Sequence, residues 1–225
     1  MSKKKIFGIV FILIGIILLI VPIVIRLSTD KKISKKVELY ENKLKQIEVA
    51  KDSPLYTYLK EYNNSLVENG QKLKDAFSNQ DTFIDLTSFG LENNVIGTLK
   101  IDKLNLYVPI YVGATDANLN NGVCIISGTS MPLGEINSNV VIAGHRGLIR
   151  HQMFRKINTL ENGDLINMST PFGDLVYKVY DTKIILPDEI ENIFIQKDRD
   201  IITLVTCHPY RVNTHRLLVY AERVQ

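Results

Sequence analysis

Cys207 ends an apolar, β-branched run that begins at Ile201, and Arg216 opens the next strand-like run. The segment between them contains Pro209 and Asn213, which is typical of a turn. If the two runs pair as an antiparallel hairpin, Cys207 and Arg216 lie side by side, on strands about 4.8 Å apart. A guanidinium beside a thiol favours the thiolate, which is the nucleophilic form. We therefore expect Arg216 to increase the acidity of the Cys207 thiol.

A proton-transfer partner for this thiol is expected at His145. The run from Asn139 to Ala143 is apolar and strand-like, and it ends at a histidine and an arginine flanked by Gly144 and Gly147. Glycine at a strand end lets backbone or ligand approach closely. A lone cysteine or histidine is more often a structural residue. Reactive groups at three strand ends favour nucleophilic catalysis instead.

Metal and cofactor sites are not expected. The candidate ligands would be Cys207, His208, His215 and His145, but no pair of them has the usual short zinc spacing. On a regular strand, adjacent Cys207 and His208 cannot both point at one ion. Cys124, the second cysteine, lies in an apolar run and is expected in the core.

These motifs resemble those of sortases, which are cysteine transpeptidases. The resemblance rests on Thr203–Cys207 followed by the strand-initial Arg216, and on Ala143–Gly147 around the histidine. The segments Ser127–Gly134 and Asn213–Val219 are most similar to class C, the pilus-assembling sortases. The resemblance runs from about Asn93 to the C-terminus, and it implies that Cys207, His145 and Arg216 are the catalytic residues.

An uncharged run from Ile6 to Ile25 follows Lys3, Lys4 and Lys5. At 1.5 Å per residue this run is long enough to span a bilayer as a helix. No small-residue cleavage site follows it, which favours an uncleaved signal anchor over a signal peptide. We expect residues 1–5 in the cytoplasm and residues 6–26 in the membrane. Basic residues also follow the run, so the extracytoplasmic placement of the remaining chain is implied by the family resemblance.

Residues 27–92 are expected to form a helical accessory region. Ser53 and Pro54 suit the cap and first position of a helix, and Gly70 suits its end. The family resemblance implies a lid over the active site in Lys74–Phe77, where class C sortases carry an Asp-Pro-aromatic motif. Asp75 would then pair with Arg216 while Phe77 covers Cys207. An ordinary solvated loop is the alternative, because Ala76 replaces the proline of that motif.

Residues 93–225 are expected to be mostly β. Short strand-like segments separated by turns suggest a closed barrel or a sandwich, and the resemblance implies the eight-stranded sortase barrel. The expected strands are Val95–Ile101, Leu106–Tyr111, Gly122–Ile126, Asn139–Ala143, Asp164–Met168, Leu175–Leu186, Ile201–Cys207 and His215–Arg223.

The resemblance implies a single-pass membrane enzyme that cleaves a Leu-Pro-x-Thr-Gly-like sorting signal through a Cys207 thioester. The acyl group would pass to an amine: a pilin lysine in class C, or a cell-wall peptide in a housekeeping sortase. A cysteine peptidase and a non-catalytic surface scaffold are the alternatives. The formal net charge of +3 is mild, and the lysine-rich stretches lack interleaved aromatics, so a nucleic-acid partner is not expected.

Overall fold

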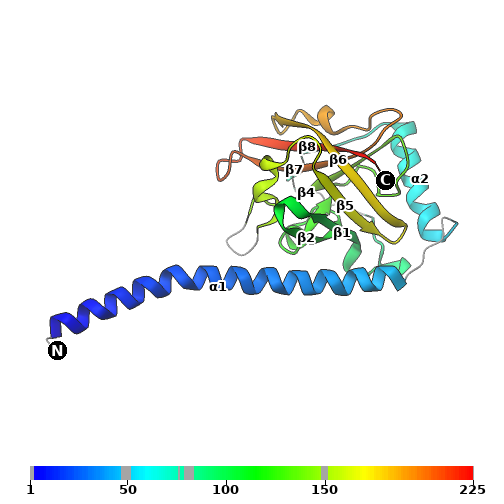
Figure 1. Cartoon of the computed structure of the whole chain (residues 1–225). Coiled ribbons are helices and arrows are strands. Elements are labelled where there is room, and N and C mark those ends of the chain that lie inside the picture. Colours follow the sequence, from blue (N-terminus) through cyan, green and yellow to red (C-terminus); the bar gives the residue numbers. More distant parts are fainter. Residues whose placement is uncertain (1–2, 47–51, 76, 79–83, 148–151, 225) are drawn as a thin grey trace.

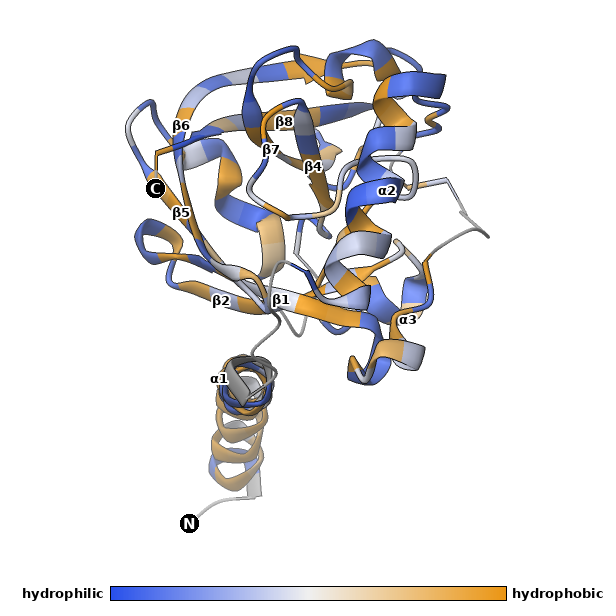
Figure 2. Ribbon diagram, turned by 90° about the vertical axis from the view of Figure 1, so that its right-hand side faces the viewer, coloured by the Kyte–Doolittle hydropathy of each residue, from blue (hydrophilic) through white to orange (hydrophobic). Residues whose placement is uncertain are grey.

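The computed structural model describes residues 3–46, 52–75, 77–78, 84–147 and 152–224. A long helix, α1, runs beside a closed β-barrel, and a second helix, α2, covers another side of the barrel (Figures 1 and 2). The helices are α1 (Lys3–Gln46), α2 (Pro54–Asn69) and α3 (Asp116–Leu119). The strands are β1 (Val95–Ile101), β2 (Leu106–Val112), β3 (Val123–Ile125), β4 (Ser138–Ala143), β5 (Leu165–Thr170), β6 (Gly173–Ile185), β7 (Asp200–His208) and β8 (His215–Arg223).

The barrel closes in the order β1-β2-β3-β4-β7-β8-β6-β5. β4 and β7 are parallel, as are β2 and β3, and the other neighbouring strands are antiparallel. All eight expected strands are present, and β1 and β8 have the expected bounds. The prediction of an eight-stranded barrel is therefore confirmed. A short 3-10 segment, Met153–Thr159, follows β4 at the position where the sequence suggested a short helix.

Two hydrophobic clusters lie on the opposite faces of the barrel wall. The larger cluster draws residues from every strand, including Leu204 and Leu217, so it fills the barrel interior. The smaller cluster contains their strand neighbours Val205 and Leu218. Successive strand side chains point to opposite faces, so the smaller cluster lies on the outer face. Both faces of β7 and β8 are thus buried, which explains their nearly continuous hydrophobicity.

The long helix α1 joins the expected membrane segment to the expected helical accessory region. It continues unbroken from Lys3 to Gln46, through Pro22. Its segment Lys4–Ile25 is long and apolar enough to cross a membrane, and it extends away from the barrel (Figure 1). Figure 2 shows the same apolar half in orange.

The C-terminal half of α1 packs on the barrel. Val37 is fully buried there, and the Tyr40 hydroxyl accepts a hydrogen bond from the Asn93 amide at 3.2 Å. Glu41 accepts a short hydrogen bond from the Tyr107 hydroxyl. The accessory helix is thus fixed to β1 and β2.

The second helix, α2, begins and ends as its sequence predicts. The Ser53 hydroxyl accepts a hydrogen bond from the Tyr56 N–H, Pro54 occupies the first turn, and Gly70 ends the helix at φ +75°. Buried Asn63 anchors the helix to the loop after β3. Its amide donates to the Met131 carbonyl at 3.0 Å and accepts from the Met131 N–H at 2.7 Å. This anchoring fixes the start of the segment that leads to the candidate lid.

Candidate active site

Cys207 and Arg216 are direct partners in the β7–β8 ladder. Cys207 shares a face of β7 with Val205, and Arg216 shares a face of β8 with Leu218, so both side chains lie on the outer face of the barrel. The expected hairpin register is confirmed. Cys207 is partly exposed, whereas the Arg216 residue is only 9% exposed.

His145 follows β4, the parallel neighbour of β7. The connection is held by the Gly144 N–H, which donates to the Val205 carbonyl at 3.1 Å, and by the Thr206 hydroxyl, which donates to the Gly144 carbonyl at 2.7 Å. A side chain at position 144 would collide with the Phe154 ring, which lies 2.6 Å from the position of its Cβ. Glycine therefore allows the strand end and the 3-10 segment to pack together. His145, Cys207 and Arg216 all lie at the same end of the barrel.

Residues 71–75 and 77–78 lie along the outer face of the barrel near these residues. Gln71 fixes the start of this segment by donating to the Gly128 carbonyl at 3.0 Å and accepting from the Ile195 N–H at 2.6 Å. Leu73 then buries its side chain in the outer hydrophobic cluster. These contacts of Gln71 and Leu73 fix the path of the chain leading to Asp75.

Asp75 and Arg216 form a bidentate ion pair. Arg216 Nε and Nη2 each donate to one Asp75 carboxylate oxygen, both at 2.7 Å. Charge-assisted pairs of this fork geometry are among the stronger polar contacts in proteins. The same guanidinium also donates to the carbonyls of Asn213 and His215. Arg216 thus donates hydrogen bonds from all three of its guanidinium nitrogens within the closed site.

Phe77 lies between the histidine and the arginine. Its ring stacks on His145, with centroids 6.5 Å apart and planes inclined by 23°. The Arg216 guanidinium carbon lies 5.3 Å from the centroid of the same ring. The space where a substrate carbonyl would meet these groups is therefore occupied. Ala76, which replaces the proline of the lid motif, lies outside the described residues.

The Cys207 thiol feels the expected effect of Arg216 together with an opposing effect of burial. Burial raises the pKa of its thiol, and the nearby Asp75 carboxylate raises it further. Arg216 and Arg146 lower the pKa as their charges require, but burial outweighs them. Burial also lowers the pKa of His145, against the opposing effect of Asp116. Both shifts favour a neutral thiol and a neutral imidazole.

Arg146 was not assigned a role from the sequence, although it belongs to the histidine motif. Its Nη1 donates to the Cys207 carbonyl at 3.1 Å and also contacts the His208 ring. Arg146 thus ties the end of β4 to the end of β7 and places a second positive charge near the thiol. Asp116, on α3, was missed as well, because only the folded chain brings it near His145.

The remaining candidates have other environments. Cys124 is completely buried, as expected, and burial raises the pKa of its thiol strongly. His215 pairs with His208 across the β7–β8 ladder and contacts the hydroxyl of its neighbour Thr214. Within the described ranges, no three His, Cys, Asp or Glu side chains gather in a metal-binding group.

The chain matches the family model for the sortase domain over residues 99–224. It is also 30% identical to sortase D of Bacillus subtilis over 131 residues, which cover 57% of this chain and 63% of that protein. The chain therefore belongs to the sortase family. The matched region spans less than two thirds of this curated relative.

Solved structures extend the similarity to the N-terminal region. Sortase C1 of Streptococcus agalactiae, in a complex with MTSET, is 30% identical with a TM-score of 0.69, covering 88% of this chain and 96% of that one. Sortase C of Clostridium perfringens, with the C-terminal cell wall sorting motif, is 33% identical with a TM-score of 0.66. That match covers 87% of this chain and 98% of the Clostridium chain. The structural likeness to pilus-type sortases confirms the expected class of fold.

Proposed function

We propose that this chain is a membrane-anchored cysteine transpeptidase of the pilus-assembling type. It would cleave a Leu-Pro-x-Thr-Gly-like sorting signal and transfer the acyl group to a lysine amine of a pilin. The observation that carries this proposal is the gathering of Cys207, Arg216 and His145 at one end of the barrel, with Phe77 in contact with both His145 and Arg216. The structural likeness to class C sortases and the Asp75–Arg216 pair favour pilin assembly over housekeeping anchoring.

The reaction would proceed through two acyl transfers. The Cys207 sulfur attacks the carbonyl carbon of the sorting signal, and the C–N bond breaks to leave a thioester. His145 takes the Cys207 thiol proton as the sulfur attacks, gives it to the leaving amine, and later accepts a proton from the incoming amine, which it returns to the released thiolate. The incoming amine then attacks the thioester and releases the thiolate. Arg216 would stabilise the oxyanion or hold the thiolate and substrate in place.

Substrate entry requires the candidate lid to open. Asp75 occupies two donors of Arg216, and Phe77 covers the adjoining space. Opening would free the guanidinium for substrate and remove the carboxylate from beside the thiol. The closed segment thus has the contacts of an autoinhibitory lid.

The N-terminal half of α1 would be the anchor. Residues 6–26 would span the membrane, with 1–5 in the cytoplasm and the accessory region 27–92 and catalytic barrel 93–225 outside. The support for this assignment is the length and apolar composition of Lys4–Ile25.

The test uses the full chain in detergent with quenched sorting-signal peptides. Product masses are compared with and without a lysine-containing acceptor peptide or a cell-wall peptide amine. We expect an amine adduct that disappears in Cys207→Ala and persists in Cys124→Ala, a control at the buried second cysteine. Loss of an oxyanion donor typically costs about a hundredfold or more in rate, so we expect Arg216→Ala to be impaired to that degree.

Other outcomes would contradict the proposal. Hydrolysis that ignores added amines and survives Arg216→Ala would indicate a cysteine peptidase. Transfer only to the cell-wall amine would indicate housekeeping anchoring. Absence of turnover both in the wild type and in a variant with Asp75→Ala and Phe77→Ala, which opens the lid, would indicate a scaffold.

A further inference from the structure

The active-site end of the barrel faces the membrane-spanning half of α1, and strand directions establish this. β4 and β7 are parallel and both end at the site. β4 is antiparallel to β3, β3 is parallel to β2, and β2 is antiparallel to β1, so β1 also runs toward the site. Residues just before β1 therefore lie at the opposite end of the barrel.

The C-terminal part of α1 contacts that opposite end. Tyr40 bonds to Asn93, and Lys43 forms an ion pair with Glu92 at 2.8 Å. Followed toward its N-terminus, α1 runs back along the barrel and past its active-site end. Ile33 still packs against the core, and Ile25 ends the apolar segment. These two residues are separated by about 12 Å along the helix axis at 1.5 Å per residue.

The β7–β8 turn, residues 209–214, projects from this end of the barrel. In Figure 1 it extends beyond the barrel in the direction of the apolar half of α1. The tip exposes two hydrophobic side chains: Tyr210 is 38% exposed and Val212 is 64% exposed. The transfer of apolar side chains from water into a bilayer lowers the free energy, and tyrosine favours the interface between membrane and water.

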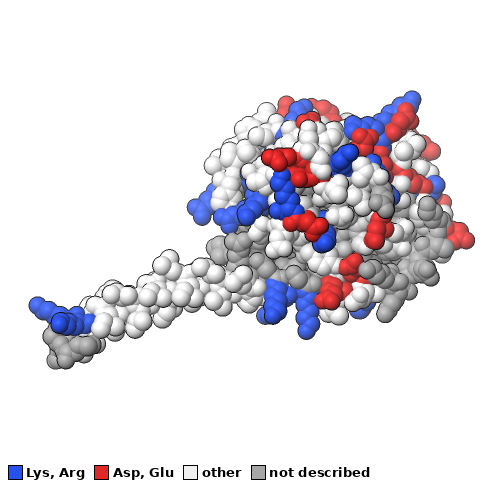
Figure 3. Space-filling view, viewed as in Figure 1, with Lys and Arg blue, Asp and Glu red and all other residues white. Residues whose placement is uncertain are grey.

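Basic side chains surround this tip. The guanidinium carbons of Arg155 and Arg211 lie 5.0 and 5.4 Å from the centroid of the Tyr210 ring, and both residues are exposed. Figure 3 shows Lys and Arg side chains on the edge of the barrel nearest the apolar half of α1. This combination of an aromatic tip with arginines suits lipid headgroups, since arginine pairs with phosphate while its stem and the ring contact apolar groups.

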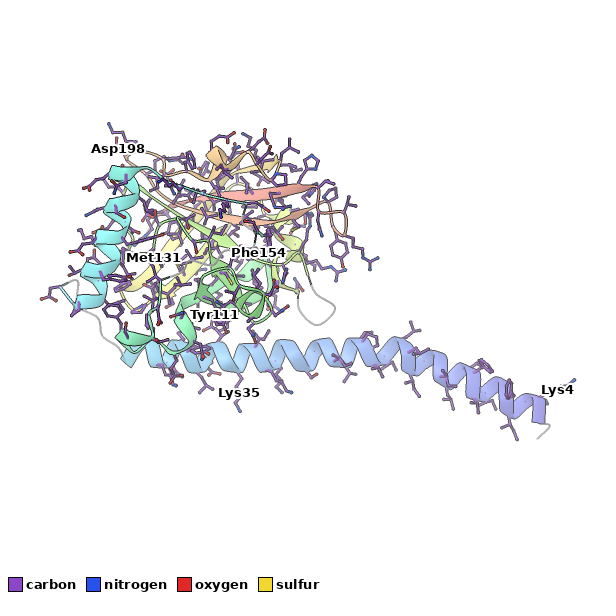
Figure 4. The ribbon with its side chains drawn as sticks, turned by 180° about the vertical axis from the view of Figure 1, so that it is seen from behind. Lys4, Lys35, Tyr111, Met131, Phe154 and Asp198 are labelled. Atoms are coloured by element: carbon purple, nitrogen blue, oxygen red, sulfur yellow. The ribbon has the colours of Figure 1, made fainter. Side chains whose placement is uncertain are left out.

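A second basic group lies on α1 between the apolar segment and the barrel. Lys31, Lys32 and Lys35 are all exposed within a few turns of Ile25. Figure 4 shows Lys35 on the face of α1 turned away from the barrel. Lysines close to a membrane surface are attracted to anionic lipids over about a Debye length of 10 Å.

We infer that the β7–β8 turn is a membrane-docking surface. Tyr210 and Val212 enter the interface of the bilayer that α1 spans, and Arg155, Arg211 and the α1 lysines bind its anionic headgroups. The catalytic end is thereby held against the bilayer surface. This inference rests on the proposed anchoring of α1, but it does not depend on transpeptidation.

The absence of tryptophan from the sequence permits a direct test. The full chain carrying Tyr210→Trp is placed in nanodiscs with or without anionic lipid, and quenching by lipids brominated on their acyl chains is measured. The matched control is Tyr58→Trp on α2, where the native tyrosine is 41% exposed. We expect a blue-shifted, quenched emission from Trp at position 210 in anionic nanodiscs, and weak quenching at position 58.

The charge requirement is tested in the same background. Adding Arg155→Gln and Arg211→Gln to Tyr210→Trp should at least halve the quenching in anionic nanodiscs. Equal quenching at positions 210 and 58 would overturn the docking surface, and equal quenching with and without anionic lipid would overturn its electrostatic basis. Failure of the chain to co-elute with nanodiscs would overturn the anchoring and the inference together. Because no step needs peptide turnover, an inactive enzyme that docks would contradict only the proposed function.

Discussion

The resting chemistry of Cys207 is set by three neighbours with opposing effects. Arg216 and Arg146 favour the thiolate, while Asp75 and burial favour the thiol. Asp75 pairs with two donors of Arg216, which raises the pKa of Arg216, and its carboxylate opposes the effect of Arg216 on the sulfur. The ion pair therefore holds the segment over the site and weakens the acidifying effect of Arg216, while burial keeps the thiol protonated. A sortase regulated in this way would be activated by breaking one contact.

Asp75→Asn should therefore make Cys207 more acidic. The substitution keeps the size of the side chain but removes the charge that raises the thiol pKa, and it releases Arg216, which lowers that pKa. Thiolate forms at lower pH when the pKa falls, so the midpoint of the alkylation rate against pH should move down. At neutral pH the rate should rise severalfold. The measurement is iodoacetamide labelling in a Cys124→Ala background.

A matched control for this labelling is Asp102→Asn, a surface aspartate paired with Lys100. It should leave the labelling profile unchanged. An unchanged or higher midpoint in Asp75→Asn would show that Asp75 does not restrain the nucleophile.

At the scale of elements, α2 is held by the Asn63 side chain, which forms a pair of hydrogen bonds with a backbone segment as a neighbouring strand would. Asn63 exchanges two hydrogen bonds with the Met131 backbone, and both residues are buried. Asn63→Ala would leave the Met131 N–H and carbonyl without these partners. We expect a loss of about 2–4 kcal/mol in the free energy of unfolding. For a chain of this size that corresponds to a fall in Tm of about 5–10 °C, measured by thermal circular dichroism.

Asn64→Ala provides the control on the same helix, because Asn64 is exposed. It should change Tm by much less. Equal effects of the two substitutions would mean that helix propensity, not the Met131 pairing, determines the loss.

The strands could be predicted because their hydrophobicity is a local signal. β1 and β8 have the predicted bounds, and the Cys207–Arg216 register follows from the short turn between β7 and β8. The continuity of α1 was not predicted, because the change from apolar to charged residues marked only the boundary between two regions. A change in hydrophobicity does not by itself end a helix, and residues 27–46 contain neither proline nor glycine, the residues that most disfavour a helix interior.

The missed parts of the site depend on tertiary packing. Asp116 approaches His145 only in the fold, and Arg146 has a role only because β4 and β7 end together. The effect of Arg216 on the Cys207 thiol could be predicted, but the opposing burial could not, because a sequence shows the neighbouring charge and not the burial. Residue types and strand ends thus indicated the candidate site, whereas its electrostatics required the folded chain.

At the scale of the whole molecule, the proposed anchoring would make the continuous helix α1 a rigid spacer that sets the height of the barrel above the membrane. Seven helix-forming residues inserted after Leu27 would raise the barrel by about 10 Å and, at 3.6 residues per turn, almost preserve its rotation. We expect cleavage of a free sorting-signal peptide to stay within about twofold, because the site is unchanged and such distant changes act independently. Quenching of Tyr210→Trp by brominated lipids should disappear.

A flexible insertion distinguishes the effect of rigid spacing from the effect of added chain length. Seven Gly and Ser residues at the same place would let the barrel approach the bilayer again, so lipid quenching should return in part. Cleavage of a membrane-anchored substrate, measured in the same nanodiscs, should fall most with the helical insertion, because only that insertion holds the site away from the bilayer surface. If both insertion variants cleave this substrate as fast as the wild type, the continuous helix α1 does not position the catalytic barrel. The barrel would then reach its substrate by diffusion while α1 serves only as an attachment.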